Sequence, residues 1–315
     1  MKEIGGYIEL DKYNLPMLHE GAIGLNCGRN ALAYLLRARN IKRLWIPKYI
    51  CDSVTEVCER EQVACSFYSI RLDFLPSRDI QLGTGEWLYF VNYYSQFDNV
   101  FIERFVKKYK RVIVDNAHSY FQMPVPDVDT LYTCRKYFGV ADGAFLYTNA
   151  VLNEELPKDE SFGRMNFLLG RFEHTASEFY SEYVSNNARF KNEPIKIMSK
   201  LTYNLLHGID YKANERIRKN NFEYLHEKLR HLNHLRISNG TFVYPLLIDN
   251  GAEIRKKLKE IKIYVPTLWP SVFSIAEKKD LEYKLSENIL PLPIDQRYTI
   301  EDMAYMIEAI KRILG

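Results

Sequence analysis

The sequence has little cysteine and no long apolar run. Five cysteines stand among 315 residues, and this odd number without close pairs fits a reducing compartment better than a disulfide framework. No apolar run approaches the roughly 20 residues of a membrane-spanning helix. The start, MKEIGGYIELDKY, carries neither the apolar segment nor the cleavage pattern of a secretory signal. A cytoplasmic protein is therefore predicted.

The sequence also has no large excess of positive or negative charge. The net charge is +3, because 43 Lys and Arg are mixed with 40 Asp and Glu, and this argues against a nucleic-acid or membrane partner. The basic helical region predicted for residues 194–235 contains Glu215, Glu223 and Glu227, so it is interpreted as a solvated helix face. Small, neutral or anionic ligands remain open.

Paired metal ligands are missing as well. Cys51, Cys58 and Cys65 recur every seven residues, a spacing that could suggest a metal site. Neither a CxxC pair nor paired histidines accompany them. Buried thiols on one helix face are therefore favoured over zinc, and no metal is predicted.

What the sequence does contain is an alternation of strands and helices from residue 20 to about residue 160. Strand-like runs such as CSFYSI, EWLYFVNYY and RVIVD are separated by helical stretches, which predicts a mostly parallel sheet flanked by helices, an α/β fold. A long helix is predicted for residues 162–190. Later strands and a final amphipathic helix predict a smaller α+β unit. We assign residues 1–205 to a large α/β domain with an N-terminal arm and residues 206–315 to a small C-terminal domain.

Three chemically reactive side chains follow the predicted strand at residues 112–114. Asp115 ends this strand, His118 comes three residues later, and Lys136 precedes the next apolar run. Open α/β sheets bind ligands at the carboxyl ends of their strands, so these side chains suggest a cofactor site. The alternatives are a turn-capping Asp115, a core His118 and a surface Lys136.

A possible anion site lies upstream in CGRNAL. Gly28 and Arg29 lead into a predicted helix, and Asn30 is expected to be its N-cap. Backbone amides at a helix start lack intrahelical partners and favour negative charge, so this turn could hold a phosphate. The simpler interpretation is a turn that merely begins a helix.

The chain order of phosphate turn, acid and lysine matches the needs of pyridoxal 5'-phosphate (PLP). An imine-forming lysine must lose its proton, and burial of Lys136 beside Arg135 would lower its pKa. A carboxylate such as Asp115 would keep the pyridine nitrogen protonated, which makes the ring an electron sink. His118 could lie against the ring or its phenolic oxygen.

These motifs resemble the DegT/StrS family of PLP-dependent sugar aminotransferases, which have the aspartate-aminotransferase-like fold type I. CGRNAL is similar to the family's Ser-Gly-Thr-Xaa-Ala-Leu turn, VDNAHS to Glu-Asp-Xaa-Ala-Gln/His, and KYFGVADGA to Lys-Xaa5-Glu-Gly-Gly. VNYYSQ and WIPKYICDSV are similar to two further family segments. The resemblance implies that Lys136 is the Schiff-base lysine, Asp115 the pyridinium partner and His118 the substitute for the usual Gln. It also implies cofactor contacts at Gly28, Arg29, Asn30 and Thr133.

The sequence departs from the family pattern around the cofactor ring. Cys51 stands where the family usually has an aromatic residue, so Tyr49 or an aromatic of VNYYSQ would have to cover the ring. Leu131 replaces a phosphate-binding Ser, and Thr133 is the nearest hydroxyl.

Two further departures concern the partner subunit and the substrate. The family's Asn-Tyr-Arg-Met-Ser stretch, whose Asn reaches the partner's phosphate, appears here as residues 195–199, and Asn192 or Lys196 would have to substitute. Trp269 and Arg297 stand where the small domain could close on a substrate. Arg297 could grip a carboxylate or could be structural.

The resemblance implies a homodimeric aminotransferase that moves an amino group from a donor such as glutamate to a keto-sugar nucleotide. One alternative is a PLP-binding protein of the same fold with a regulatory or no catalytic role. Another is a PLP-dependent sugar dehydratase, but relatives with that activity replace the lysine by histidine, and Lys136 argues against it.

Overall fold

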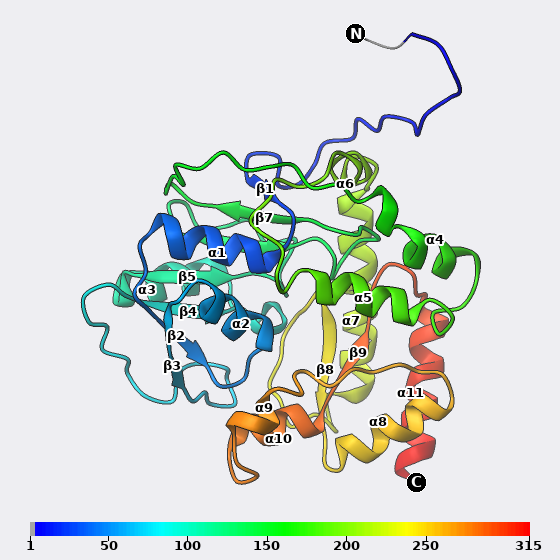
Figure 1. Cartoon of the computed structure of the whole chain (residues 1–315). Coiled ribbons are helices and arrows are strands. Elements are labelled where there is room, and N and C mark those ends of the chain that lie inside the picture. Colours follow the sequence, from blue (N-terminus) through cyan, green and yellow to red (C-terminus); the bar gives the residue numbers. More distant parts are fainter. Residues whose placement is uncertain (1–3) are drawn as a thin grey trace.

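The computed structural model describes residues 4–315 and shows strands and helices alternating through the first half of the chain (Figure 1). The strands are β1 (Ile23–Leu25), β2 (Arg43–Pro47), β3 (Ala64–Tyr68), β4 (Glu86–Val91), β5 (Val112–Asp115), β6 (Thr130–Thr133), β7 (Ala144–Tyr147), β8 (Val243–Leu247) and β9 (Ile289–Pro293). The helices are α1 (Gly28–Ala38), α2 (Asp52–Arg60), α3 (Asn99–Tyr109), α4 (Asn166–Glu173), α5 (Tyr180–Arg189), α6 (Lys200–Leu206), α7 (Tyr211–Leu229), α8 (Gly251–Glu260), α9 (Val272–Ile275), α10 (Leu281–Asn288) and α11 (Ile300–Leu314). Two short 3-10 turns, η1 (Tyr93–Ser95) and η2 (Phe162–Arg164), complete the elements.

The main sheet has the strand order β1-β7-β6-β5-β4-β2-β3. Strands β3, β2, β4, β5 and β6 run parallel, whereas β7 is antiparallel to both β6 and β1. The apolar residues 112–114 of β5 are buried at the centre of this sheet, as expected for a strand covered on both faces. The predicted fold class, a mostly parallel sheet flanked by helices with a smaller C-terminal α+β part, is confirmed.

The pairing of β5 with β6 determines where Asp115 and Lys136 lie. Asp115 is paired with Leu131, and both strands continue toward the same edge of the sheet. Because carboxyl ends of parallel strands meet at one edge, Asp115 and the segment that follows Thr133 come together there. Lys136 lies in that segment.

The C-terminal part is built on the antiparallel pair β8 and β9, with α7, α8 and α11 packed around it (Figure 1). One continuous hydrophobic cluster joins this part to the main sheet, since it includes both Leu88 of β4 and Leu246 of β8. The proposed domain boundary between residues 205 and 206 therefore stays a prediction.

The prediction of one long helix over residues 162–190 is wrong. The segment forms η2, α4 and α5, and the helix breaks after Glu173. In the break, the Thr175 backbone amide donates to Glu178 Oε1 at 3.2 Å, a local bond that competes with helical pairing. A Cβ added at Gly170 would lie 2.3 Å from the Phe179 ring, so the glycine allows Phe179 to pack back against α4.

The prediction that Cys51, Cys58 and Cys65 lie on one helix face is wrong. Only Cys58 lies within a helix, α2, whereas Cys51 immediately precedes it and Cys65 belongs to β3. The seven-residue period arises because a short helix and a turn separate the positions.

Within residues 4–315, no helix is both long and apolar enough to cross a lipid bilayer.

A buried histidine fastens the chain before β1 to the sheet. His19 Nε2 lies 2.8 Å from the Tyr120 carbonyl oxygen, and Nδ1 lies 3.2 Å from the Tyr147 hydroxyl. Its ring packs on Tyr132, with 4.2 Å between the centroids. The carbonyl can only accept, so Nε2 carries the proton and a neutral imidazole satisfies both contacts. Burial lowers the pKa of His19 to about 4, despite the bond to Tyr120.

We expect His19 to make the protein less stable as the pH falls from about 6.5 to about 4. In this window the unfolded chain binds a proton that the folded chain refuses, so unfolding becomes easier by up to about 3 kcal/mol. Urea denaturation of the native protein and of His19→Gln at pH 7 and pH 4.5 measures this. The variant should lose less stability between the two pH values, and equal losses would contradict the assignment.

Candidate active site

Asp115 is held rigidly at the end of β5. Its Oδ2 accepts a hydrogen bond from the Tyr89 hydroxyl at 2.8 Å, and its Oδ1 accepts one from the Ala117 amide at 2.8 Å. The residue is only 9% exposed, and burial raises the pKa of Asp115, while the charge of Lys136 and these two bonds oppose the rise. The carboxylate is thus oriented from two sides and lies within electrostatic reach of the lysine.

Lys136 reaches solvent, yet it lies among charged and apolar groups of the site. Burial of its amine lowers the pKa of Lys136, and Arg29 lowers it further, whereas Asp115 and Cys51 raise it. Its Nζ lies 5.3 Å from the centroid of the Phe242 ring. The side chain as a whole is solvent-exposed, whereas its amine is largely desolvated. In the described part of the chain, no carboxylate is within ion-pair distance of this amine.

The positive charge that acts on Lys136 is that of Arg29 and not, as predicted, that of Arg135. The guanidinium of Arg135 points elsewhere, bonding Asn187 Oδ1 and lying 4.8 Å from the centroid of the Phe190 ring. The two residues lie in a turn after β6, where the amides of Tyr137 and Phe138 donate to the Cys134 carbonyl, so adjacency in sequence does not direct the two side chains to the same groups. The prediction that Arg135 depresses the lysine pKa is wrong, and Arg29 has that effect.

His118 is buried between aromatic rings beside the lysine. Its ring stacks on Phe242 at 4.3 Å and on Trp269 at 5.7 Å between centroids. Burial and the nearby Lys136 charge hold the pKa of His118 well below its usual range, so the imidazole is neutral. Nδ1 accepts a long bond of 3.4 Å from the Tyr94 amide, which leaves the proton on Nε2.

The predicted phosphate turn does begin a helix, but its N-cap is Cys27, so the assignment of Asn30 as the N-cap is wrong. Within the described residues, the amides of Gly28 and Arg29 have no acceptor. A Cβ added at Gly28 would lie 3.9 Å from Thr133 Cβ, so the turn faces that hydroxyl-bearing residue. The two amides and Thr133 form a small anion-sized group of donors at the start of α1.

Asn30 serves the fold instead. Its side chain donates to Asn26 Oδ1 at 2.9 Å and to the Pro194 carbonyl at 2.7 Å, and accepts from Arg60 Nη2 at 2.8 Å. Its own amide donates to the Cys27 carbonyl at 3.1 Å. Because these donors are engaged, we leave Asn30 out of the proposed phosphate contacts.

The aromatic side chains expected over a cofactor ring lie in the core. Tyr49, Tyr93 and Tyr94 are fully buried, and the hydroxyls of Tyr49 and Tyr94 bond each other at 2.9 Å. Phe242, only partly buried, is the aromatic ring that faces Lys136. Sequence reasoning missed it because it comes from the C-terminal part and stands next to no recognisable motif.

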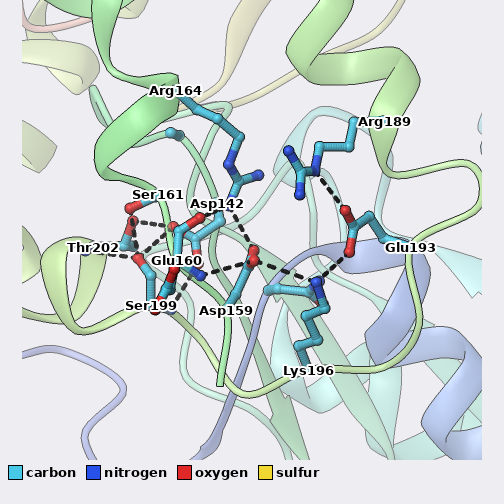
Figure 2. Close-up of polar contacts among 12 residues, drawn as sticks. Asp142, Asp159, Glu160, Ser161, Arg164, Arg189, Glu193, Lys196, Ser199 and Thr202 are labelled. Carbon is cyan, nitrogen blue, oxygen red and sulfur yellow. Dashed lines mark hydrogen bonds and ion pairs between the residues drawn. The ribbon is translucent and has the colours of Figure 1, made fainter. Parts of the chain in front are cut away.

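Figure 2 shows the polar network around Lys196, the residue suggested as a substitute for a missing family contact. Lys196 Nζ lies 2.5 Å from Glu193 and 3.7 Å from Asp159, so it is engaged within its own chain. Asp159 also bonds Arg164 at 2.7 Å. This does not support the use of Lys196 for a partner's phosphate, and the same suggestion for Asn192 stays a prediction.

In the same network Asp142 accepts from the Ser199 amide at 2.8 Å and from the Ser199 hydroxyl at 2.7 Å (Figure 2). Gly143 follows with φ +117°, where a Cβ would lie 3.0 Å from Thr202 Cγ2. A glycine is therefore required between this acid and β7. The acid and glycine of the predicted motif fasten the loop after Lys136 to the start of α6.

Arg297 and the largest described hollow do not belong to the group formed by Asp115, His118 and Lys136. Arg297 forms a two-pronged ion pair with Asp295 at 2.6 and 2.8 Å, which favours its structural interpretation. A hollow of about 680 Å³ is lined by Ser119 and Thr241, chain neighbours of His118 and Phe242, but not by the candidate site residues themselves. Among residues 4–315, no cluster of His, Cys, Asp or Glu is suited to hold a metal ion.

Several solved structures share this fold. DesV from S. venezuelae, solved with a ketimine intermediate, superposes with a TM-score of 0.65 at 14% identity, covering 96% of this chain and 90% of that one. Spr1654 from Streptococcus pneumoniae in its PLP form gives 0.64 at 13% identity, covering 94% and 88%. A DegT DnrJ EryC1 StrS aminotransferase from Brucella abortus gives 0.61 at 14% identity, covering 94% and 87%.

No protein-family model and no curated protein matches the chain by sequence. The structural likeness extends over nearly the whole chain, so the predicted DegT/StrS-type fold is confirmed. The roles of individual residues are a separate question, because at this identity the likeness establishes the fold alone.

Without cofactor, we expect Lys136 to react with an acylating reagent at a lower pH than the exposed Lys200. Burial and Arg29 lower the pKa of the Lys136 amine, so a larger fraction of it is neutral and nucleophilic. Asp115→Asn removes a charge that raises this pKa and should make Lys136 more reactive. Competitive labelling across a pH series with mass spectrometry measures both effects, and a Lys136 that titrates with or above Lys200 would refute the assignment.

Proposed function

We propose that this chain, which has the fold of the DegT/StrS-type sugar aminotransferases, is a PLP-dependent aminotransferase whose cofactor is joined to Lys136. The observation that carries the proposal is the meeting of three groups. The oriented carboxylate of Asp115, the amine of Lys136 and the donors at the start of α1 all lie where the parallel strands end.

The residues present fit the cofactor. The unpaired amides of Gly28 and Arg29, with Thr133 beside them, suit its phosphate. Asp115 suits the pyridine nitrogen because Tyr89 and Ala117 fix its orientation. Lys136 suits the aldehyde because no acid competes for its amine among the residues that the structure describes.

PLP, when bound, supplies an electron sink for charge that develops on the substrate carbon. Lys136 Nζ, when free, would take the proton from that carbon and deliver it to the C4' carbon of the cofactor, and its lowered pKa favours the neutral form needed for the first step. Asp115 would hold the ring nitrogen in its protonated form and stabilise its charge. His118, whose Nδ1 is occupied by the Tyr94 amide, would have its Nε2 proton available as a donor.

The donor and acceptor are inferred from the resemblance and from the names of the structural neighbours. We propose an amino acid such as glutamate as donor and a keto-sugar nucleotide as acceptor. Phe242 and Trp269 supply aromatic surfaces beside Lys136 and His118, against which a sugar ring can pack. A cytoplasmic location stays a prediction.

A second candidate is a PLP-binding protein without turnover. Leu131 in place of the phosphate-binding serine and the engagement of Lys196 within its own chain favour it. The dehydratase alternative is disfavoured, because Lys136 stands where such relatives carry histidine.

The purified chain mixed with PLP should develop a visible absorbance band that Lys136→Ala abolishes. Lys200→Ala, which removes an exposed lysine on α6, should leave the band unchanged. Glutamate should shift the band if the protein is an aminotransferase. A spectrum without any band would refute the cofactor proposal, and a band that no amino donor shifts would favour the non-catalytic candidate.

We further propose a homodimer. The single chain exposes large apolar side chains on its N-terminal arm and on α4 and α5, among them Tyr7, Leu169, Phe172 and Tyr180. The arm extends away from the body (Figure 1), so its apolar residues have little contact with their own chain. Clustered exposed apolar residues of this kind are typical of interfaces.

Light scattering of the full chain should therefore give twice the mass of one chain. Phe172→Asp, at a side chain that is 93% exposed, should weaken the dimer because it buries a charge in the interface. Val100→Asp on α3 is the matched control and should leave the dimer intact. A monomeric native protein would contradict the dimer proposal without affecting the cofactor assignment.

A further inference from the structure

Arg218 of α7 is a fully buried charge that makes no ion pair with an acid, although the charge of Asp295 acts on it through space. The residue is 1% exposed, and within residues 4–315 no carboxylate lies within ion-pair distance of its guanidinium. Burial lowers the pKa of Arg218 to about 10. A buried charge costs much free energy unless polar groups surround it, so its contacts indicate what it does.

All of the contacts are to neutral oxygens from three distant segments. Nη1 donates to the Thr241 carbonyl at 2.7 Å and Nη2 to the Tyr137 carbonyl at 3.1 Å. Nε donates to Gln296 Oε1 at 2.8 Å, and Gln296 Nε2 donates in turn to the same Tyr137 carbonyl at 2.8 Å. The guanidinium also lies 4.6 Å from the centroid of the Tyr137 ring.

The two carbonyls belong to residues that are directly bonded to site residues. Tyr137 follows Lys136, and Thr241 precedes Phe242. One guanidinium therefore ties together the segments that carry the amine and the aromatic ring, whose Nζ-to-centroid distance is 5.3 Å. A planar fork of donors can span both carbonyls, whereas the single ammonium of a lysine cannot reproduce that geometry.

We propose that Arg218, with Gln296, is a positioning residue that fixes Lys136 of the main sheet against Phe242 of the C-terminal part. Arg218 acts through the two peptide segments and does not touch the reacting groups. The arrangement itself is a property of the chain without cofactor, while its importance for turnover rests on the proposed function.

The first test measures the reactivity of Lys136 in the chain without cofactor. Arg218→Met frees both segments, water reaches the amine more easily, and the labelling rate of Lys136 near neutral pH should fall several-fold as its pKa rises. Arg216→Met, at an exposed position of the same helix, should leave the rate unchanged. Thermal unfolding of each variant identifies a protein that fails to fold.

Two companion variants separate geometry from charge. Arg218→Lys keeps the charge but loses the fork, so it should behave like Arg218→Met, and native-like labelling in this variant would overturn the proposal. Gln296→Leu removes one donor from the Tyr137 carbonyl and retains Arg218. It should shift the labelling in the same direction by a smaller factor, which keeps the proposal testable if the Arg218 variants do not fold.

A second readout uses the protein with PLP. The pH midpoint of the absorbance band should move in Arg218→Met, and this effect should shrink in a Phe242→Leu background, because coupled residues are not additive. A native protein without any band would refute the proposed function and leave the labelling test standing. A normal band whose midpoint, like the labelling rate, is unchanged in the Arg218 variants would overturn the positioning role alone.

Discussion

The buried carboxylate of Asp115 is the constraint on which the site depends. An ionised acid at the end of a central strand is unfavourable unless donors and an opposite charge surround it. Tyr89 from the neighbouring strand, the Ala117 amide and the charge of Lys136 meet that need. The same groups fix the direction of the carboxylate, so the condition for stability also supplies the orientation that its proposed role requires.

The site is shared between the two parts of the chain. The main sheet supplies Asp115, His118 and Lys136, whereas Phe242 and Trp269 come from the C-terminal part and stack on the histidine. A C-terminal part held in this way can adjust the environment of the lysine without contributing a reactive group.

The fold could largely be predicted from sequence, whereas the groups that surround Asp115 and Lys136 could not. The apolar run before Asp115 and the alternation of elements were sufficient for the sheet, because burial on both faces leaves a strong local pattern. The roles of Arg135 and Asn30 were misjudged, because the direction of a side chain depends on packing partners far away in sequence. The break in the helix predicted for residues 162–190 likewise depends on Phe179 packing against Gly170.

The sequence alone determined the order of the phosphate turn, acid and lysine, since hydrophobic period and motif spacing are local properties of the chain. Only the tertiary structure decided which groups surround the Lys136 amine. Arg29, Cys51 and Phe242 are brought there by three separate segments, and no spacing in the sequence records that meeting. The physical reason is that desolvation and charge act through space, so the chemistry of a buried amine is a property of the folded chain.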